Sequence, residues 1–182
     1  MGEKMMPPQE SFISPFNGPV EIGLRAISIL NDAFPSAYSL QRIVIFDYLS
    51  VHSDDISGGP EGLHPQTPHR NGELLVRRNV VQKGLLLYMA RGLAVQKFRL
   101  NGIVYAATEK TGSFLDVLQS EYIFELRKRT RWLVETFSDM DDDHLNTFIR
   151  KHLGAWGAEF EMESVLSVSY THLRAHETGR NL

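Results

Sequence analysis

The chain has 182 residues, of which 42% are hydrophobic and 23% charged, a composition typical of a globular protein and not of a disordered or collagen-like chain. The 19 Lys and Arg residues against 22 Asp and Glu residues give a formal charge of −3, so the net charge does not attract nucleic acid or an anionic membrane. The absence of cysteine excludes a disulfide framework, a thiolate nucleophile and a cysteine-ligated zinc site, and it favours a reducing compartment.

Residues 1–18 are expected to form a flexible lead-in, because they combine prolines and mixed charges with no apolar run of signal-peptide length. The chain also has no uncharged apolar stretch of about 18 residues that would span a membrane. We therefore expect a cytoplasmic protein.

The first half of the chain predicts three helices. The first is indicated by apolar residues at spacings of three and four, ending before Pro35: Val20, Leu24, Ile27, Leu30 and Phe34. The second, capped by Ser39, runs from Leu40 to Val51 and is apolar nearly all round, so it should be central. The third lies between a cap at Asn71 and a stop at Gly92.

A loop over residues 53–72 separates the second and third predicted helices. It is rich in Gly and Pro, with His and Asp between them, and shows no periodicity. Connections of more than about 12–15 residues are uncommon in compact domains and are often functional. This loop is therefore a candidate functional segment.

A β-hairpin is predicted around Asn101-Gly102, a dipeptide suited to the positive φ angles of a type I′ turn. This turn sets Leu100 opposite Ile103 and Phe98 opposite Tyr105 on a packed face, while Lys97 and Arg99 lie on the solvated face.

The region after the hairpin predicts further helices. A short helix is expected at 114–118, and a longer one, capped by Ser120, carries Arg127, Lys128, Arg129 and Arg131 on its solvated face. The aspartates at 141–143 fit the start of another helix. The elements together predict a mainly α protein with a β-hairpin, an α+β fold with a winged helix-turn-helix-like core over 19–137 and a helical extension over 138–167.

The last residues have a different origin. Val168–Thr178, VSYTHLRAHET, resembles a translated adapter of a common DNA sequencing library. We expect residues 168–182 to be an assembly artefact and the native portion to end near Ser167. The spacing of four between His172 and His176 is then no indication of a metal site.

No catalytic residues, cofactor or metal are predicted. His52, Asp54, Asp55, His64 and His69 in and around the loop could supply zinc ligands, but their spacings fit no metal-site pattern, and such histidines more often bond their own backbone. The chain has neither a phosphate-binding P-loop nor a Gly-x-Ser-x-Gly elbow. A metal-dependent hydrolase on the loop remains an alternative.

A DNA-binding interpretation follows from the order of three helices and a hairpin, in which a third helix enters the major groove. The residues that would contact DNA are Arg77, Arg78, Lys83, Lys97, Arg99 and Asn101. Solvated faces carry Lys and Arg in any case and the net charge is negative, so we favour a function without DNA contact and keep a winged-helix regulator as an alternative.

Several segments between Glu21 and Phe137 resemble the second class of middle components of bacterial ABC-type three-component systems. The similarity is carried by EIGLRA from Glu21, DYLSVHSDD from Asp47, GPEGLHP from Gly59, PHRNGELLVRR from Pro68 and GIVYAATE from Gly102. The chain departs from the family pattern at Gly62, where Ser is usual, and at His69, where Tyr is usual.

The resemblance implies a non-enzymatic adaptor encoded between an SMC-like ABC ATPase and an effector, in systems that act against phages or plasmids. These two proteins are the implied partners, with DNA contact only through the complex and with no membrane or small-molecule substrate.

We further expect a charge-assisted network that holds the long loop against the second and third helices and presents a docking surface for a partner. Its candidate residues are His52, Asp55, His64, Arg70, Glu73, Arg77 and Arg78.

Overall fold

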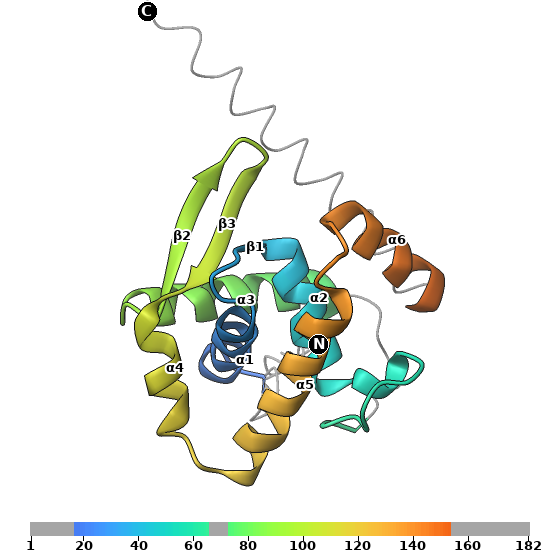
Figure 1. Ribbon diagram of the computed structural model, residues 1–182, viewed down its shortest axis with the longest axis horizontal. Helices are drawn as coiled ribbons and strands as arrows, with labels where there is room; N and C mark the ends of the chain where they lie inside the picture. Colours follow the sequence, from blue (N-terminus) through green and yellow to red (C-terminus); the bar gives the residue numbers. More distant parts are fainter. Residues whose placement is uncertain (1–16, 66–72, 154–182) are drawn as a thin grey trace, which may run out of the picture.

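The computed structural model describes residues 17–65 and 73–153 (Figure 1). In chain order the elements are α1 (Pro19–Asp32), β1 (Tyr38–Ser39), α2 (Leu40–Val51), the 3-10 helix η1 (Ser53–Asp55), α3 (Glu73–Met89), β2 (Ala94–Arg99), β3 (Gly102–Ala107), α4 (Glu109–Asp116), α5 (Glu121–Phe137) and α6 (Asp142–Leu153). Helices dominate and the strands form one antiparallel sheet, which confirms the predicted α+β class.

Helix α2 lies at the centre of the fold, as its apolar sequence predicts. The Ser39 side chain accepts a hydrogen bond from the Arg42 backbone N–H at 3.1 Å, which confirms the predicted cap. Every residue from 42 to 51 is buried, and α1, α3 and α5 all pack against the helix. A polar side chain within this stretch therefore needs a partner inside the protein.

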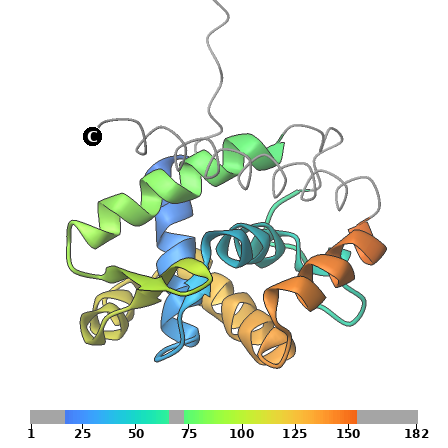
Figure 2. The same cartoon turned by 90° about the horizontal axis from the view of Figure 1, so that it is seen from above.

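Helices α1 and α3 cross at a glycine contact (Figure 2). A Cβ atom on Gly84 would lie 2.6 Å from Cα of Gly23, so the two backbones meet with no side chain between them. The first helix is shorter than its predicted stripe, because it ends at Asp32. The two ends of the stripe, Val20 and Phe34, are exposed.

Strand β1 is absent from the prediction, because two residues between helices carry no periodicity. Tyr38 pairs with Tyr105 and Ser39 with Val104, which gives the strand order β1-β3-β2. The order of three helices followed by a hairpin is as predicted. The winged-helix assignment itself stays a prediction.

The predicted hairpin register is wrong by two residues. Phe98 pairs with Ile103 and Arg99 with Gly102, so Leu100 and Asn101 form the turn, and only Gly102 takes a positive φ, of 119°. The base of the hairpin sets this register, because Ala94, Tyr105 and Ala107 are buried there. The shift keeps each residue on its predicted face, but Phe98, Leu100 and Ile103 at the tip are exposed and not packed.

The C-terminal helices pack on the same core. Helix α4 begins five residues before the predicted 114–118 segment, because Thr108 and Thr111 form a capping box at its start. Ser120 caps α5 as predicted, and α6 starts at the aspartates. Leu145 and Ile149 of α6 join the core formed by α1, α2 and α5. In the described ranges, every helix is too short or too polar to cross a membrane.

Candidate partner-docking site

A buried carboxylate occupies the middle of α2. Asp47 accepts hydrogen bonds from Arg25 of α1, with Nε 2.6 Å from Oδ1, and from Arg77 of α3, with Nη1 2.5 Å from Oδ2. All three side chains are buried. The triad therefore joins the three helices that lie next to one another in the core.

The opposite charges in this triad stabilise one another in their ionised forms. Burial acts to raise the pKa of Asp47, but the positive charges of Arg25 and Arg77 and their hydrogen bonds lower it below its ordinary value. Burial likewise acts to lower the pKa of Arg25, while Asp47 and the Tyr122 hydroxyl raise it. Asp47 and Arg25 therefore stay ionised at neutral pH.

The end of α2 and the loop after it extend this network. The Tyr48 hydroxyl donates to Asp55, and the Tyr48 ring lies 4.7 Å from that of His52 and 5.6 Å from the Arg77 guanidinium carbon. His64 Nε2 lies 3.1 Å from the Tyr122 hydroxyl of α5. The loop is thus connected to α2 at one end and to α5 at the other.

His64 is neutral at physiological pH in this setting. Partial burial, the charge of Arg25 and the neighbouring His52 lower the pKa of His64 to about 4. A neutral imidazole accepts or donates a single hydrogen bond at Nε2, as the contact with Tyr122 requires.

His64 is expected to make folding sensitive to mild acid. Its pKa of about 4 in the folded state lies below the ordinary value of 6.5, so between these two pH values the unfolded chain binds more protons. Stability that is full above pH 6.5 is then lost as the pH falls towards 4. Urea midpoints at pH 7 and pH 5 should differ less for His64→Gln than for the wild type. The control is His152→Gln, at an exposed position. If the midpoint difference between pH 7 and pH 5 is the same in His64→Gln as in this control and in the wild type, His64 does not have this role.

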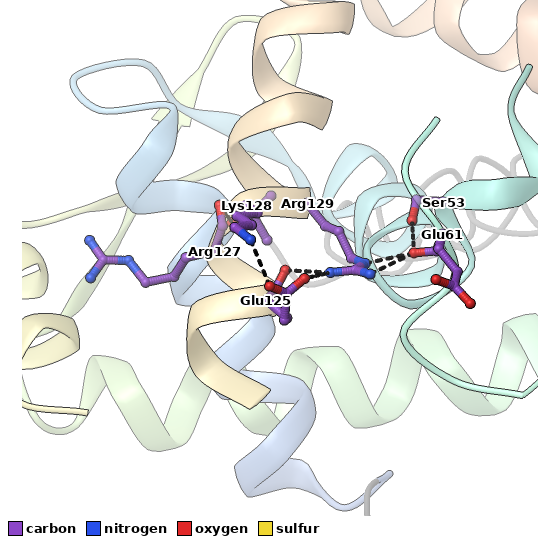
Figure 3. A network of polar contacts seen from close by, with 7 residues as sticks. Ser53, Glu61, Glu125, Arg127, Lys128 and Arg129 are labelled. Carbon is purple, nitrogen blue, oxygen red and sulfur yellow. Dashed lines mark hydrogen bonds and ion pairs between the residues drawn. The ribbon is translucent and has the colours of Figure 1, made fainter. Parts of the chain in front are cut away.

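Arg129 of α5 anchors the middle of the loop (Figure 3). Its Nε and Nη2 donate to the backbone carbonyl of Glu61 at 2.9 and 2.7 Å, and Nη1 donates to the Glu125 carboxylate at 2.8 Å. The Ser53 hydroxyl donates to the same Glu61 carbonyl at 3.2 Å. The expectation that Arg129 lies on a solvated face is therefore wrong, because the side chain is buried under the loop.

Removal of this anchor is expected to loosen the loop without unfolding the protein. The backbone N–H groups of Leu63 and His64 both donate to the Val51 carbonyl, at 2.9 and 3.0 Å. In Arg129→Ala their hydrogen exchange should become at least about tenfold faster, because local opening then costs less free energy. Arg127→Ala is the matched control, since Arg127 points away from the loop (Figure 3). Its guanidinium pairs with Asp116 on the surface at 2.8 Å. Equal exchange rates in the two variants would refute the anchor.

The structure brings four of the predicted network residues together: His52, Asp55, His64 and Arg77. Arg78 donates to the Gln41 side chain at 3.3 Å. Glu73 is the first residue of α3, and Arg70 lies outside the described residues. Docking through these residues stays a prediction.

The network also contains four residues that were not predicted for it from the sequence: Arg25, Asp47, Tyr122 and Arg129. Asp47 had a usable signal, because an acidic residue inside a helix that is apolar nearly all round needs a buried cation. The arginines had no comparable signal. Arg25 bonds Asp47 from 22 positions away and Arg129 bonds the Glu61 carbonyl from 68 positions away, and the spacing of arginines does not reveal which of them is buried.

The residues of the DNA-binding interpretation divide into two groups. Lys83 on α3 and Lys97, Arg99 and Asn101 on the hairpin are exposed. Arg77 is buried on Asp47 and does not face solvent as a phosphate contact would. The outer face of α3 presents Leu86 and Leu87, which are 57% and 36% exposed.

Within residues 17–65 and 73–153, the His, Asp and Glu side chains do not converge in a group of three that would hold a metal ion. The His52 and His64 rings are 6.4 Å apart and nearly perpendicular. His64 bonds the Tyr122 hydroxyl, and ring contacts connect His52 to Tyr48 and His64.

Comparison with known proteins identifies the family. Neither the curated proteins nor the solved structures contain a match to this chain. The sequence profile of the ABC-three component (ABC-3C) system Middle Component 2 family matches residues 15–159, which include every described element. The chain therefore belongs to the ABC-3C system Middle Component 2 family.

Proposed function

We propose that this protein is a non-enzymatic adaptor that links an SMC-like ABC ATPase to an effector in a bacterial three-component defence system. Membership of the family makes the chain a component of an ABC-3C system. The adaptor role is supported most directly by the buried Arg25–Asp47–Arg77 triad, whose charged groups are bound to one another in the core. Such groups stabilise a rigid body and are not available to a substrate.

The loop over residues 53–65 is the proposed docking surface. Arg129 and the Val51 carbonyl hold its backbone, and Tyr122 contacts the His64 side chain. The side chains of Asp54, Ser57 and Glu61 are exposed. A surface that is ordered before binding loses little conformational entropy when a partner docks. This combination of a fixed backbone and exposed polar side chains suits a docking surface better than a catalytic one.

Protein docking explains the described surface better than DNA binding does. The outer face of α3, which a winged-helix regulator inserts into the major groove, carries exposed leucines. Contiguous exposed apolar residues are typical of protein interfaces.

Co-expression with the ATPase and the effector encoded beside this chain tests the proposal. The charge reversal Glu61→Lys changes an exposed side chain of the docking surface, and we expect it to reduce co-purification of a partner by at least about tenfold. Glu135→Lys, at an exposed position of α5, should have no effect.

Three results would refute the adaptor role. The first is failure of both components to co-purify with the wild type. The second is sequence-selective binding to duplex DNA that weakens steeply with salt, which would support a regulator. The third is stoichiometric zinc that survives dialysis and is lost in His64→Ala, which would support a hydrolase.

A further inference from the structure

A groove of about 1420 Å³ separates the hairpin tip from the turn between α5 and α6. Figure 1 shows the hairpin and α6 on opposite sides of β1. Tyr38 and Arg42 lie between the two walls. The groove is distinct from the docking surface at residues 53–65, which contributes none of its lining.

The hairpin wall of the groove carries three exposed apolar side chains beside Arg99 and Asn101. Phe98 is 79% exposed, Leu100 is fully exposed and Ile103 is 45% exposed. Phe98 and Ile103 are directly paired across the hairpin, so their side chains lie on the same face of the sheet. Three adjacent apolar side chains that reach beyond the body of the protein indicate a surface that another molecule covers.

The opposite wall is acidic, with Asp141, Asp142 and Asp143 in succession. Asp142 is bound to the buried Arg42 at 2.7 Å. Asp141 accepts hydrogen bonds from the backbone and side chain of His144, which lower its pKa and keep it ionised. Asp143 is exposed. Arg42 offsets one of the three negative charges and Arg99 is the other basic residue of the lining, so the groove keeps a net charge of −1 and attracts cations.

We infer that the groove binds a basic amphipathic segment of another component of the same system, with its apolar side chains on Phe98 and Leu100 and its Lys or Arg side chains towards Asp141 and Asp143. This inference rests on the proposed adaptor function and adds a second docking surface to it. Helical or extended segments of this kind bind apolar grooves with charged rims.

The charge of the remaining chain argues against its own ends as occupants. Residues 154–167 contain three glutamates and no Lys or Arg, and residues 1–16 contain two glutamates and one lysine. Both segments would bring like charge to the acidic wall. Arg174 and Arg180 are the only Lys or Arg residues after position 153, and they lie in the expected artefact.

The test is co-expression of the full chain with the ATPase and the effector. Leu100→Asp alters the hairpin wall and Asp143→Lys reverses a charge on the acidic wall; both positions are exposed, so folding should be intact. We expect each to reduce capture of one component by at least about tenfold. The matched controls on α4 and its end, Val117→Asp and Asp116→Lys, should capture it as the wild type does. Tiled peptides of the captured component that bind should contain Lys or Arg beside apolar residues.

The opposing results are distinct. If the loop variant Glu61→Lys abolishes capture and both groove variants retain it, the groove inference fails and the adaptor role stands. If the wild type captures neither component, both the groove inference and the adaptor role fail.

Two further results would show a different occupant of the groove. A dimer in light scattering that Leu100→Asp dissociates would mean that the groove holds a second copy. Stronger capture by Arg174→Ser/Arg180→Ser would mean that the chain fills its own groove. Either result would overturn the inference.

Discussion

Asp47→Asn is expected to reduce the free energy of unfolding by about 3–5 kcal/mol, the range for breaking a buried ion pair by removing one partner. The substitution keeps the volume of the side chain but leaves Arg25 and Arg77 buried without a counter-charge. Urea unfolding at pH 7, followed by circular dichroism, measures the change. Part of the population should be unfolded at 37 °C, because this loss is a large fraction of the stability of an ordinary domain.

The matched control for Asp47→Asn is Asp116→Asn, which removes an exposed ion pair with Arg127. Surface pairs of this kind contribute about 0–1 kcal/mol. The pH dependence is a second check. Because the pKa of Asp47 is lowered in the folded state, its contribution is full at neutral pH and is lost as the pH falls below about 3.9, the unfolded value. Equal stabilities of the two variants would show that the triad does not hold the helices together.

Gly84→Ala is expected to reduce the free energy of unfolding by about 2–3 kcal/mol or to prevent folding, because overpacking a tight contact forces the backbone to move. The new methyl group would lie 2.6 Å from both N and Cα of Gly23 and 2.7 Å from the Pro19 carbonyl oxygen. These neighbours are backbone atoms, so rotation of a side chain does not relieve the clash. Thermal unfolding of the purified variant measures the loss.

Gly112→Ala is the matched control for Gly84→Ala, since it also places alanine at a helical glycine. There the nearest atom to the new methyl group is the Asn31 side-chain oxygen at 3.4 Å. Alanine favours the helix by about 0.5–1 kcal/mol over glycine, so this variant should be as stable as the wild type or slightly more stable. A similar loss of stability in both variants would mean that alanine destabilises any helical glycine position of this protein, and that the α1–α3 contact is not the cause.

Local sequence signals predicted the elements well. Ser39 and Ser120 begin helices because their side chains bond backbone N–H groups three residues on, a requirement that is visible in the sequence. Gly92 follows the end of α3 and has a φ of 70°, a backbone conformation that favours glycine. The central position of α2 followed from its apolar sequence. For the two serine caps and for Gly92, the deciding feature is local in the sequence.

Long-range contacts decided what the sequence left open. The hairpin register depends on which base residues the core buries, and the turn dipeptide alone pointed to a different pairing. Arg129 and its neighbours on α5 look alike in sequence, and only the Glu61 carbonyl, 68 positions away, distinguishes them. The same applies to the candidate site, where Arg25 and Asp47 lie 22 positions apart and meet only after α1 and α2 pack.

The bond from Arg129 to the loop ends on the main chain of Glu61, while the Glu61 carboxylate points away from it (Figure 3). Every amino acid has such a carbonyl oxygen, so the anchor places no demand on the identity of residue 61. The exposed side chain at this position is therefore free to vary while the path of the backbone is retained. In this arrangement recognition can diversify by point substitution without the need to redesign the scaffold beneath it.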